Sequence, residues 1–150
     1  MSVYKTNGNI KMKNIDLEIE TENGTAVAEG YTVGIQSVNI FNWFSSIAYE
    51  TSAKKIIDYL IEKEADEIAV LKSVYVPEED RNKGYGNSLI SNFLDEVGEV
   101  SFVFLECDNA ESNEISLKEW YKDFGFESFS DIFKLKDVEG IEDLMFLRMD

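Results

Sequence analysis

The stretch LKSVYVPEEDRNKGYGNSLISNFL, residues 71–94, constrains the fold more than any other part of the chain. Its start, Leu71 to Val76, is rich in apolar and β-branched residues, which favours a strand that stops at Pro77. Its end has apolar residues at the spacing of one helix face, namely Leu89, Ile90, Phe93, Leu94 and Val97. The chain is therefore expected to pass from a strand through a tight turn into an amphipathic helix.

The turn has the composition of an anion-binding site. Gly84 and Gly86 lack the Cβ atom that would keep a phosphate away from the main chain. Asn82, Lys83 and Tyr85 offer N–H groups beside them, at the positive end of the helix dipole. The chain contains neither the Walker string G-x-x-x-x-G-K-[ST] nor the three-glycine Rossmann pattern. We therefore expect a phosphate-binding turn of another kind.

The composition is that of a globular protein. The 150 residues are 44% hydrophobic and most simply form one domain. No apolar run approaches the ~20 residues that cross a bilayer, and the start MSVYKTNGNIKMKN lacks the apolar core of a signal peptide. The single cysteine, Cys107, cannot form an internal disulfide. We expect a soluble, cytoplasmic protein.

The net charge restricts the classes of binding partner, and the absence of histidine restricts the possible catalytic mechanisms. A net charge of −16 opposes binding to nucleic acid or to an anionic membrane. It favours cationic acceptors such as amines, polyamines or lysine-rich protein surfaces, although an acidic surface also serves solubility alone. Without histidine, Ser-His-Asp and Cys-His catalysis and histidine metal sites are excluded, and no metal site is expected. A general base must be a carboxylate, a tyrosine or an ordered water.

The N-terminal part predicts a hairpin and a helix. Residues 13–21 alternate between apolar and polar, Asn23-Gly24 supplies a hairpin turn, and residues 25–33 return as the partner strand. The apolar segment 34–46 fits a strand and a helix equally well. Thr51 or Ser52 is expected to cap a helix that runs to about Ala65.

The C-terminal part predicts a βαβ unit and a closing hairpin, so the fold class is α+β around one mixed sheet. Strands are expected at 67–76 and at 100–106, where continuous apolarity suits a central position, with a helix between them that ends at Gly98. The later expectations are a Ser116/Glu119 capping box, a helix ending at Gly125, a strand at 126–135, a turn at 136–142 and a last strand at 143–149.

Two motifs resemble those of the GNAT superfamily, the acetyl-CoA-dependent N-acetyltransferases. R-x-x-G-x-G at Arg81 to Gly86, after V-x-V at Val74 to Val76, is similar to motif A. Y-x-x-x-G-F, beginning at Tyr121, is similar to motif B. One departure is that three residues, Glu78 to Asp80, separate Pro77 from Arg81 where the family commonly has two, which predicts a bulged entry to the turn.

The resemblance implies a compact bacterial or phage-type GNAT domain over 1–150. Its cofactor-binding core spans 67–149, and the hairpin and helix at 10–65 are atypical of the family. The implied fold is a mixed, mostly antiparallel sheet flanked by helices. The implied cofactor is acetyl-CoA, held by Val74, Tyr75, Val76, Arg81, Asn82, Lys83, Gly84, Tyr85, Gly86, Asn87 and Asn109.

The implied reaction is direct attack of an amine on the acetyl thioester. Tyr121 is expected to protonate the leaving thiolate, and the N–H of Tyr75 or Val76 to bind the oxyanion. The family often has a glutamate on the motif A strand, but Lys72, Ser73 and Tyr75 occupy those positions. Glu106 is therefore our preferred base, and the alternatives are Asp108, Glu50 and water.

Several functions stay open at this stage. The leading prediction is acetyl transfer to a cationic small molecule or a protein lysine by a monomer or homodimer, without nucleic-acid or membrane partners. A catalytically silent, CoA-binding interaction module is the second. An acidic DNA mimic that inhibits a nucleic-acid enzyme is the third. It is the only one of the three functions that does not require the glycine turn to bind a ligand.

Overall fold

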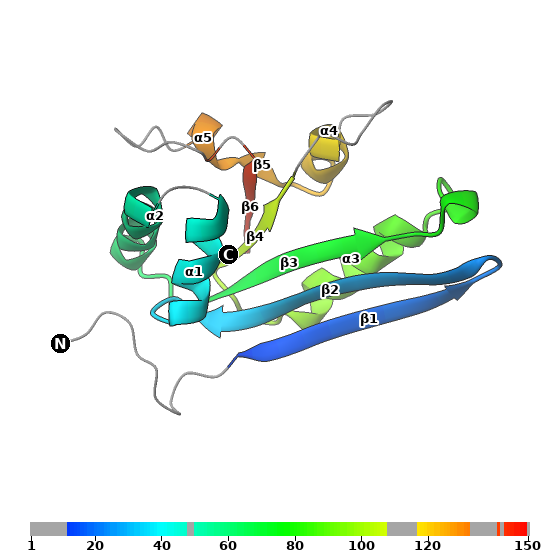
Figure 1. Cartoon of the computed structure of the whole chain (residues 1–150), viewed down its shortest axis with the longest axis horizontal. Coiled ribbons are helices and arrows are strands. Elements are labelled where there is room, and N and C mark those ends of the chain that lie inside the picture. Colours follow the sequence, from blue (N-terminus) through cyan, green and yellow to red (C-terminus); the bar gives the residue numbers. More distant parts are fainter. Residues whose placement is uncertain (1–11, 48–49, 108–116, 133–140, 142, 150) are drawn as a thin grey trace.

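The computed structural model describes residues 12–47, 50–107, 117–132, 141 and 143–149. These residues form a six-stranded sheet in the order β1-β2-β3-β4-β6-β5, with helices on both of its faces (Figure 1). The elements in chain order are β1 (Lys13–Thr21), β2 (Gly24–Gly34), α1 (Val38–Ile47), α2 (Glu50–Glu62), β3 (Glu67–Tyr75), the 3-10 turn η1 (Glu78–Asp80), α3 (Tyr85–Glu96), β4 (Phe102–Glu106), α4 (Leu117–Lys122), β5 (Glu127–Ser128), α5 (Phe129–Ile132) and β6 (Leu144–Arg148).

The predicted hairpin and βαβ unit are confirmed. β1 and β2 pair antiparallel from Lys13↔Thr32 to Thr21↔Gly24, around the Asn23-Gly24 turn. β3 and β4 pair parallel with α3 as the crossover, and the other strand pairs of the described sheet are antiparallel. The fold is therefore α+β with a mixed, mostly antiparallel sheet, as expected.

The sheet separates two hydrophobic cores. On one face, here called the α2 face, α1, α2 and α5 pack over Ile68 and Val70 of β3. On the other, the α3 face, α3 and α4 pack over Ala69 and Leu71 of the same strand. Successive residues of β3 thus point to opposite faces, as strand geometry requires. The near-continuous apolarity of the central strands follows from this double cover.

The structure decides one element that the sequence left open and corrects another. The segment that fitted strand and helix equally forms a helix, α1, which buries Ile40 and Phe44. The strand expected at 126–135 is wrong for residues 129–132, where the chain turns into α5, and residues 133–135 lie outside the described residues. That turn sets Phe129 against Phe104 and Phe146, with ring centroids 6.2 and 5.7 Å away.

The remaining differences are small. α4 ends at Lys122, and Gly125 follows with a φ of 102°. α2 ends at Glu62, where Glu64 adopts a φ of 61° and takes the role usually given to glycine. Ser116 of the expected capping box and residues 136–140 of the expected turn lie outside the described residues. Among the described helices, none has the length and apolarity that a bilayer crossing needs.

Candidate active site

The two parallel strands at the centre of the sheet part from each other. Pairing between β3 and β4 runs from Ile68↔Phe102 only to Leu71↔Leu105. β3 then continues to Tyr75 while still paired with β2 (Figure 1). From Lys72 onward, the β4-facing edge of β3 therefore has no strand partner within the described residues. A strand edge without a partner offers N–H and C=O groups to a ligand.

A β-bulge lies where the strands part. Gly30 of β2 pairs with Leu71, but the preceding residue of β2, Glu29, pairs with Ser73, so Lys72 is an extra residue in β3. A bulge bends its strand and increases the local twist. The bend begins at the last residue of β3 that is paired with β4. No pattern in the sequence predicted this bulge.

The entry to the glycine turn is a 3-10 turn and not the bulge that was predicted. Pro77 precedes it, the Asp80 N–H donates to the Pro77 carbonyl at 2.9 Å, and the Arg81 N–H donates to the Glu78 carbonyl at 3.3 Å. The Arg81 side chain folds back, since its Nε donates to the Val76 carbonyl at 3.1 Å. The extra residue is thus absorbed in a hydrogen-bonded turn.

The start of α3 presents a group of backbone amides. Asn82 and Gly84 adopt left-handed φ values of 66° and 90°. The first amide with a backbone acceptor is that of Ser88, which donates to Gly84 at 3.1 Å. Within the described residues, the N–H groups of 82–87 have no hydrogen-bond acceptor. These amides are available to an anion, as the sequence predicted for this turn.

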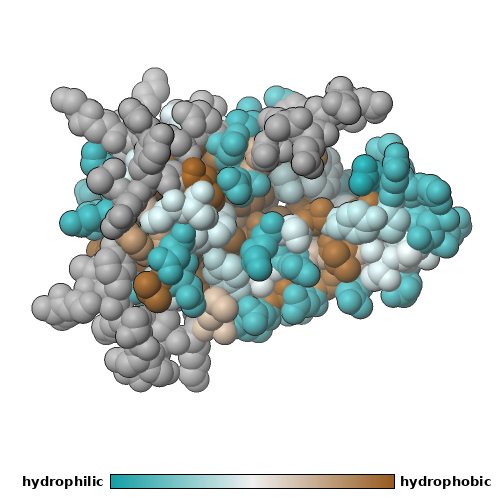
Figure 2. Space-filling model, in the orientation of Figure 1, coloured by the Kyte–Doolittle hydropathy of each residue, from teal (hydrophilic) through white to brown (hydrophobic). Residues whose placement is uncertain are grey.

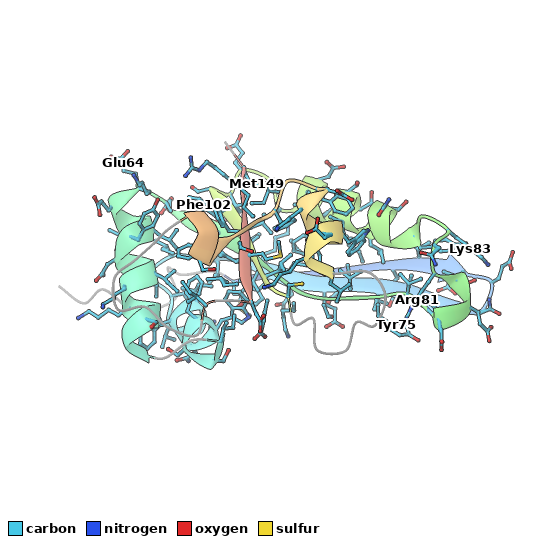
Figure 3. The ribbon with its side chains drawn as sticks, turned by 90° about the horizontal axis from the view of Figure 1, so that it is seen from above. Glu64, Tyr75, Arg81, Lys83, Phe102 and Met149 are labelled. Atoms are coloured by element: carbon cyan, nitrogen blue, oxygen red, sulfur yellow. The ribbon has the colours of Figure 1, made fainter. Side chains whose placement is uncertain are left out.

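Two cationic side chains accompany these amides. Arg81 and Lys83 are exposed and lie at the same end of the molecule as Tyr75, far from Phe102 and Met149 (Figure 3). A Cβ at Gly84 would meet no atom within 4 Å, so the space beside that residue is open. An anionic group that sits against the main chain fits this donor set.

Trp120 of α4 packs on the start of α3. Its indole ring occupies the space above Gly86, where a Cβ would lie 3.1 Å from Cζ2. The indole N–H also donates to Oδ1 of Asn87 at 3.0 Å. Trp120 is partly buried and packs against the α3-face core. Its second role, joining α4 to the glycine turn, was not predicted.

Tyr121 therefore lies near the predicted turn. Its ring is 4.9 Å from that of Trp120, and it packs against the α3-face core. Burial raises the pKa of the Tyr121 phenol to about 12, and the nearby Cys107 thiol adds to the shift. The phenol is thus protonated at all physiological pH values. Cys107 itself is buried at 1% exposure.

Glu106 lies on the opposite face of the sheet from Tyr121. Phe104 belongs to the α2-face core and Leu105 to the α3-face core, so alternation places exposed Glu106 on the α2 face. The parted strands thus have a phenol on one face and a carboxylate on the other. Asp108, Asn109 and the side chain of Glu50 lie outside what the structure describes.

Asp80 is a further site residue that the sequence did not indicate. Its side chain is fully buried beneath the turn. A hydrogen bond from Thr21, with others from Asn23 and Lys83, keeps the pKa of the carboxyl below its usual value although burial opposes the shift. The only signal in the sequence was the extra residue between Pro77 and Arg81. Searched over the described residues, the chain holds no cluster of three or more metal-binding side chains.

The mixed sheet, with one parallel pair that parts beside a glycine turn, has the arrangement that the resemblance to the GNAT motifs predicted. No protein-family model and no curated protein matches the chain. Solved structures with a similar arrangement include the ribosomal-protein-S18-alanine N-acetyltransferase of Escherichia coli. It is 16% identical, with a TM-score of 0.49, over 92% of this chain and 70% of that one.

Two further solved structures are similar to the same degree. Arylalkylamine N-acetyltransferase 2 of Aedes aegypti is 15% identical over 87% of this chain and 71% of that one, with a TM-score of 0.49. A KacTA–DNA complex contains a chain that is 13% identical over 95% of this chain and 70% of that one, with a TM-score of 0.48.

Proposed function

We propose that this protein transfers an acetyl group from acetyl-CoA to the amine of a cationic acceptor. One observation carries the proposal. The central parallel strands part beside a turn of unpaired amides, with Tyr121 on one face and Glu106 on the other. The space between β3 and β4 beyond the Leu71–Leu105 pair is here called the gap. An acyl thioester and an amine can meet in this gap from opposite faces of the sheet, which brings the two reactants together.

The residues present fit the phosphate-rich part of coenzyme A. The N–H groups of 82–87 would bind the pyrophosphate, with Arg81 and Lys83 as neighbouring cations. Gly84 leaves room for close approach to the main chain, whereas the space beside Gly86, which was also expected to be open to a phosphate, is filled by the Trp120 indole. The edge of β3 at Val74 and Tyr75, which has no strand partner on the β4 side among the described residues, would bind the amide-containing arm as an added strand would, and the N–H of Val76 would extend it.

The cofactor would supply the acetyl group as a thioester, and the protein would manage protons and charge. Glu106 accepts a proton from the acceptor ammonium, which leaves a neutral amine to attack the carbonyl carbon. The N–H of Tyr75 or Val76 would bind the negative charge that develops on the carbonyl oxygen. The protonated phenol of Tyr121 would donate a proton to the leaving thiolate, and the proton lost from the acylated nitrogen would return to the phenol through solvent.

The acceptor side of the gap is acidic. The strand register places Asp16, Glu29 and Ser73 in one row across β1, β2 and β3 on the α2 face, and Glu18, Val27 and Tyr75 in the next. In Figure 2, hydrophilic residues lie over this face among hydrophobic and intermediate ones. Asp16 and Glu29 are directly opposite each other, which is unfavourable for like charges.

Within the part of the chain that the structure describes, these carboxylates have no paired cation. Asp16, Glu18 and Glu29 take part in no ion pair within the described residues. Tyr75, 52% exposed, adds an aromatic face on which a cation can lie. A cationic acceptor that approaches over this face relieves the repulsion and reaches the gap from the side of Glu106.

An acceptor screen tests the proposed function. The protein is incubated with acetyl-CoA and with a polyamine or a lysine-rich peptide, and both thiol release and acetylated acceptor are measured. We expect transfer to at least one of these acceptors. Glu106→Gln should slow it about tenfold or more and alter the acidic limb of the pH–rate profile. Glu99→Gln, which removes an exposed carboxylate remote from the gap, should leave the rate unchanged.

Other outcomes separate the alternatives. Binding of acetyl-CoA without transfer to any amine would favour the silent, CoA-binding module, for which Lys72 and Ser73 on the motif A strand are the supporting residues. An unshifted acidic limb in Glu106→Gln would remove Glu106 from the mechanism and leave Asp108, Glu50 or water. Absence of any binding would contradict the enzyme and the module alike, and would leave the acidic inhibitor.

A further inference from the structure

The tip of the β1–β2 hairpin is attached to the glycine turn by a buried carboxylate. Asp80, the last residue of η1, has no exposed side-chain surface. Its Oδ2 accepts a hydrogen bond from the Thr21 hydroxyl at 2.6 Å and another from the Asn23 N–H at 3.1 Å. Its Oδ1 accepts one from the Asn23 side-chain amide at 2.9 Å. These three donors all belong to a turn that lies far upstream in the sequence.

The fourth donor belongs to the glycine turn itself. Lys83 Nζ lies 3.3 Å from Oδ1 of Asp80 and 3.9 Å from a carboxylate oxygen of Glu22 at the hairpin tip. One carboxylate thus accepts hydrogen bonds from both segments. Charge-assisted hydrogen bonds of this kind are about twice as strong as neutral ones.

An independent packing contact joins the same two segments. A Cβ at Gly24, in the hairpin turn, would lie 3.2 Å from Cγ of Pro77, the residue that precedes η1. Pro77 is itself buried. The hairpin tip and the entry to the glycine turn therefore touch through side-chain packing as well as through the carboxylate.

We propose that Thr21 and Asn23 are positioning residues for the glycine turn, acting through Asp80. The N-terminal hairpin is then part of the cofactor site, although none of its residues was expected to be. The buried carboxylate fixes η1 relative to the hairpin, and η1 leads directly into the amides of 82–87. The effect on cofactor affinity rests on the proposed function, whereas the mechanical linkage does not.

Amide hydrogen exchange in the ligand-free protein tests the linkage. The reporters are the N–H groups of Arg81 and Ser88, which are hydrogen-bonded within the turn. Thr21→Val keeps the shape of the side chain but removes the hydroxyl, and it should raise exchange at both reporters about fivefold or more while β4 is unaffected. Asp80→Asn should do the same more strongly, if it folds.

Matched controls address changes in charge and in hairpin stability. The Thr21 hydroxyl also lies 2.9 Å from the Gly24 carbonyl within the hairpin, a contact that Asp80→Asn leaves in place. Thr25→Val removes another hydroxyl from the same hairpin, one that contacts only exposed Glu20 in the described structure. Glu79→Gln removes the same charge as Asp80→Asn from the adjacent, exposed position. Both controls should leave exchange at the reporters within about twofold of the wild type.

Calorimetry with coenzyme A as the probe supplies the second measurement. Thr21→Val should weaken binding about fivefold or more, and Thr25→Val should not. Unchanged exchange at Arg81 and Ser88 in Thr21→Val would overturn the proposal, as would faster exchange with unchanged affinity. If the wild type binds no coenzyme A, the proposed function fails, and exchange alone decides whether tip and turn move as one unit.

Discussion

Tyr121 is the residue on which the proposed chemistry depends most. Replacing it by phenylalanine keeps the packing against Trp120 and removes only the proton donor. We expect kcat to fall about 100-fold, as for loss of a general acid, while KM for acetyl-CoA changes little. Steady-state kinetics would show this. Tyr59→Phe, on the α2 face, is the control and should leave kcat unchanged. A Tyr121→Phe enzyme with wild-type kcat would exclude the phenol from the mechanism.

Two buried tyrosines should limit stability at high pH. Burial raises the pKa of Tyr31 and of Tyr121 to about 12, from an ordinary value of 10.0. Below pH 10 both phenols are protonated in the folded and the unfolded chain. Between pH 10 and 12 only the unfolded chain ionises, so each tyrosine lowers the free energy of unfolding by up to about 1.4 kcal/mol per pH unit.

Urea unfolding on either side of pH 10 measures this effect. Tyr31, which is 8% exposed, has no role in the proposed reaction, so Tyr31→Phe isolates one of the two contributions. We expect that variant to lose less stability than the wild type between about pH 9 and about pH 11. The same loss in both proteins would show that Tyr31 ionises as easily in the folded state as in the unfolded one.

Single residues of the site were predictable to different degrees. Gly84, Gly86 and Tyr121 carry motifs that depend on local spacing, and the structure brings their segments together through Trp120. Asp80 depends on donors almost sixty residues upstream, which no local pattern records. Its neighbours Glu78 and Glu79 are exposed, and the sequence does not distinguish the buried acid among the three.

At the scale of elements, β2 contains a matched pair of glycines that tests the packing of α3 on the sheet. A Cβ at Gly30 would collide with the Val70 carbonyl and would lie 2.6 Å from the Phe93 ring. A Cβ at Gly34 would meet nothing within 4 Å. Gly30→Ala should therefore lower the free energy of unfolding by about 3 kcal/mol, and Gly34→Ala should be nearly neutral. Equal denaturation midpoints would contradict the packing of α3 described here.

Elements with strong periodicity were predicted well, and elements fixed by tertiary contacts were not. The alternation around Ile15 identified β1, and helical spacing around Phe93 identified α3, because in each case one face is buried and one is not. α1 is apolar on most sides, so its period was ambiguous. α5 exists because Phe129 joins an aromatic cluster with partners from β4 and β6, and that information is not local.

The candidate site is formed mainly where secondary-structure elements end or become irregular, and less by the regular elements themselves. The bulge at Lys72 and the end of the β3–β4 pairing coincide, so one irregularity both bends the strand and frees its edge. Lys72 and Ser73 interrupt an otherwise apolar strand, and this is the one feature of the sequence that marks the position. Bulge geometry depends on the partner strand, which the motif itself does not contain.

For the whole molecule, the charge of −16 should govern acceptor choice. The α2 face carries uncompensated carboxylates beside the gap, and salt screens their attraction for a cation. Raising NaCl from about 50 mM to about 500 mM should increase KM for a lysine-rich peptide about tenfold. KM for an uncharged amine should change by less than about twofold under the same conditions. Parallel responses of the two acceptors would exclude the acidic face from acceptor binding.

The measurement that tests the central claim most directly is calorimetric titration of coenzyme A into three proteins. Gly84→Ala and Gly98→Ala place a Cβ at the two ends of α3, at left-handed φ values of 90° and 69° and with nothing within 4 Å. The two variants carry similar backbone strain, but only Gly84→Ala lies at the glycine turn. We predict a micromolar Kd for the wild type and Gly98→Ala, weakened about tenfold in Gly84→Ala. No binding by the wild type, or equal affinities in all three proteins, would contradict a cofactor site at this turn.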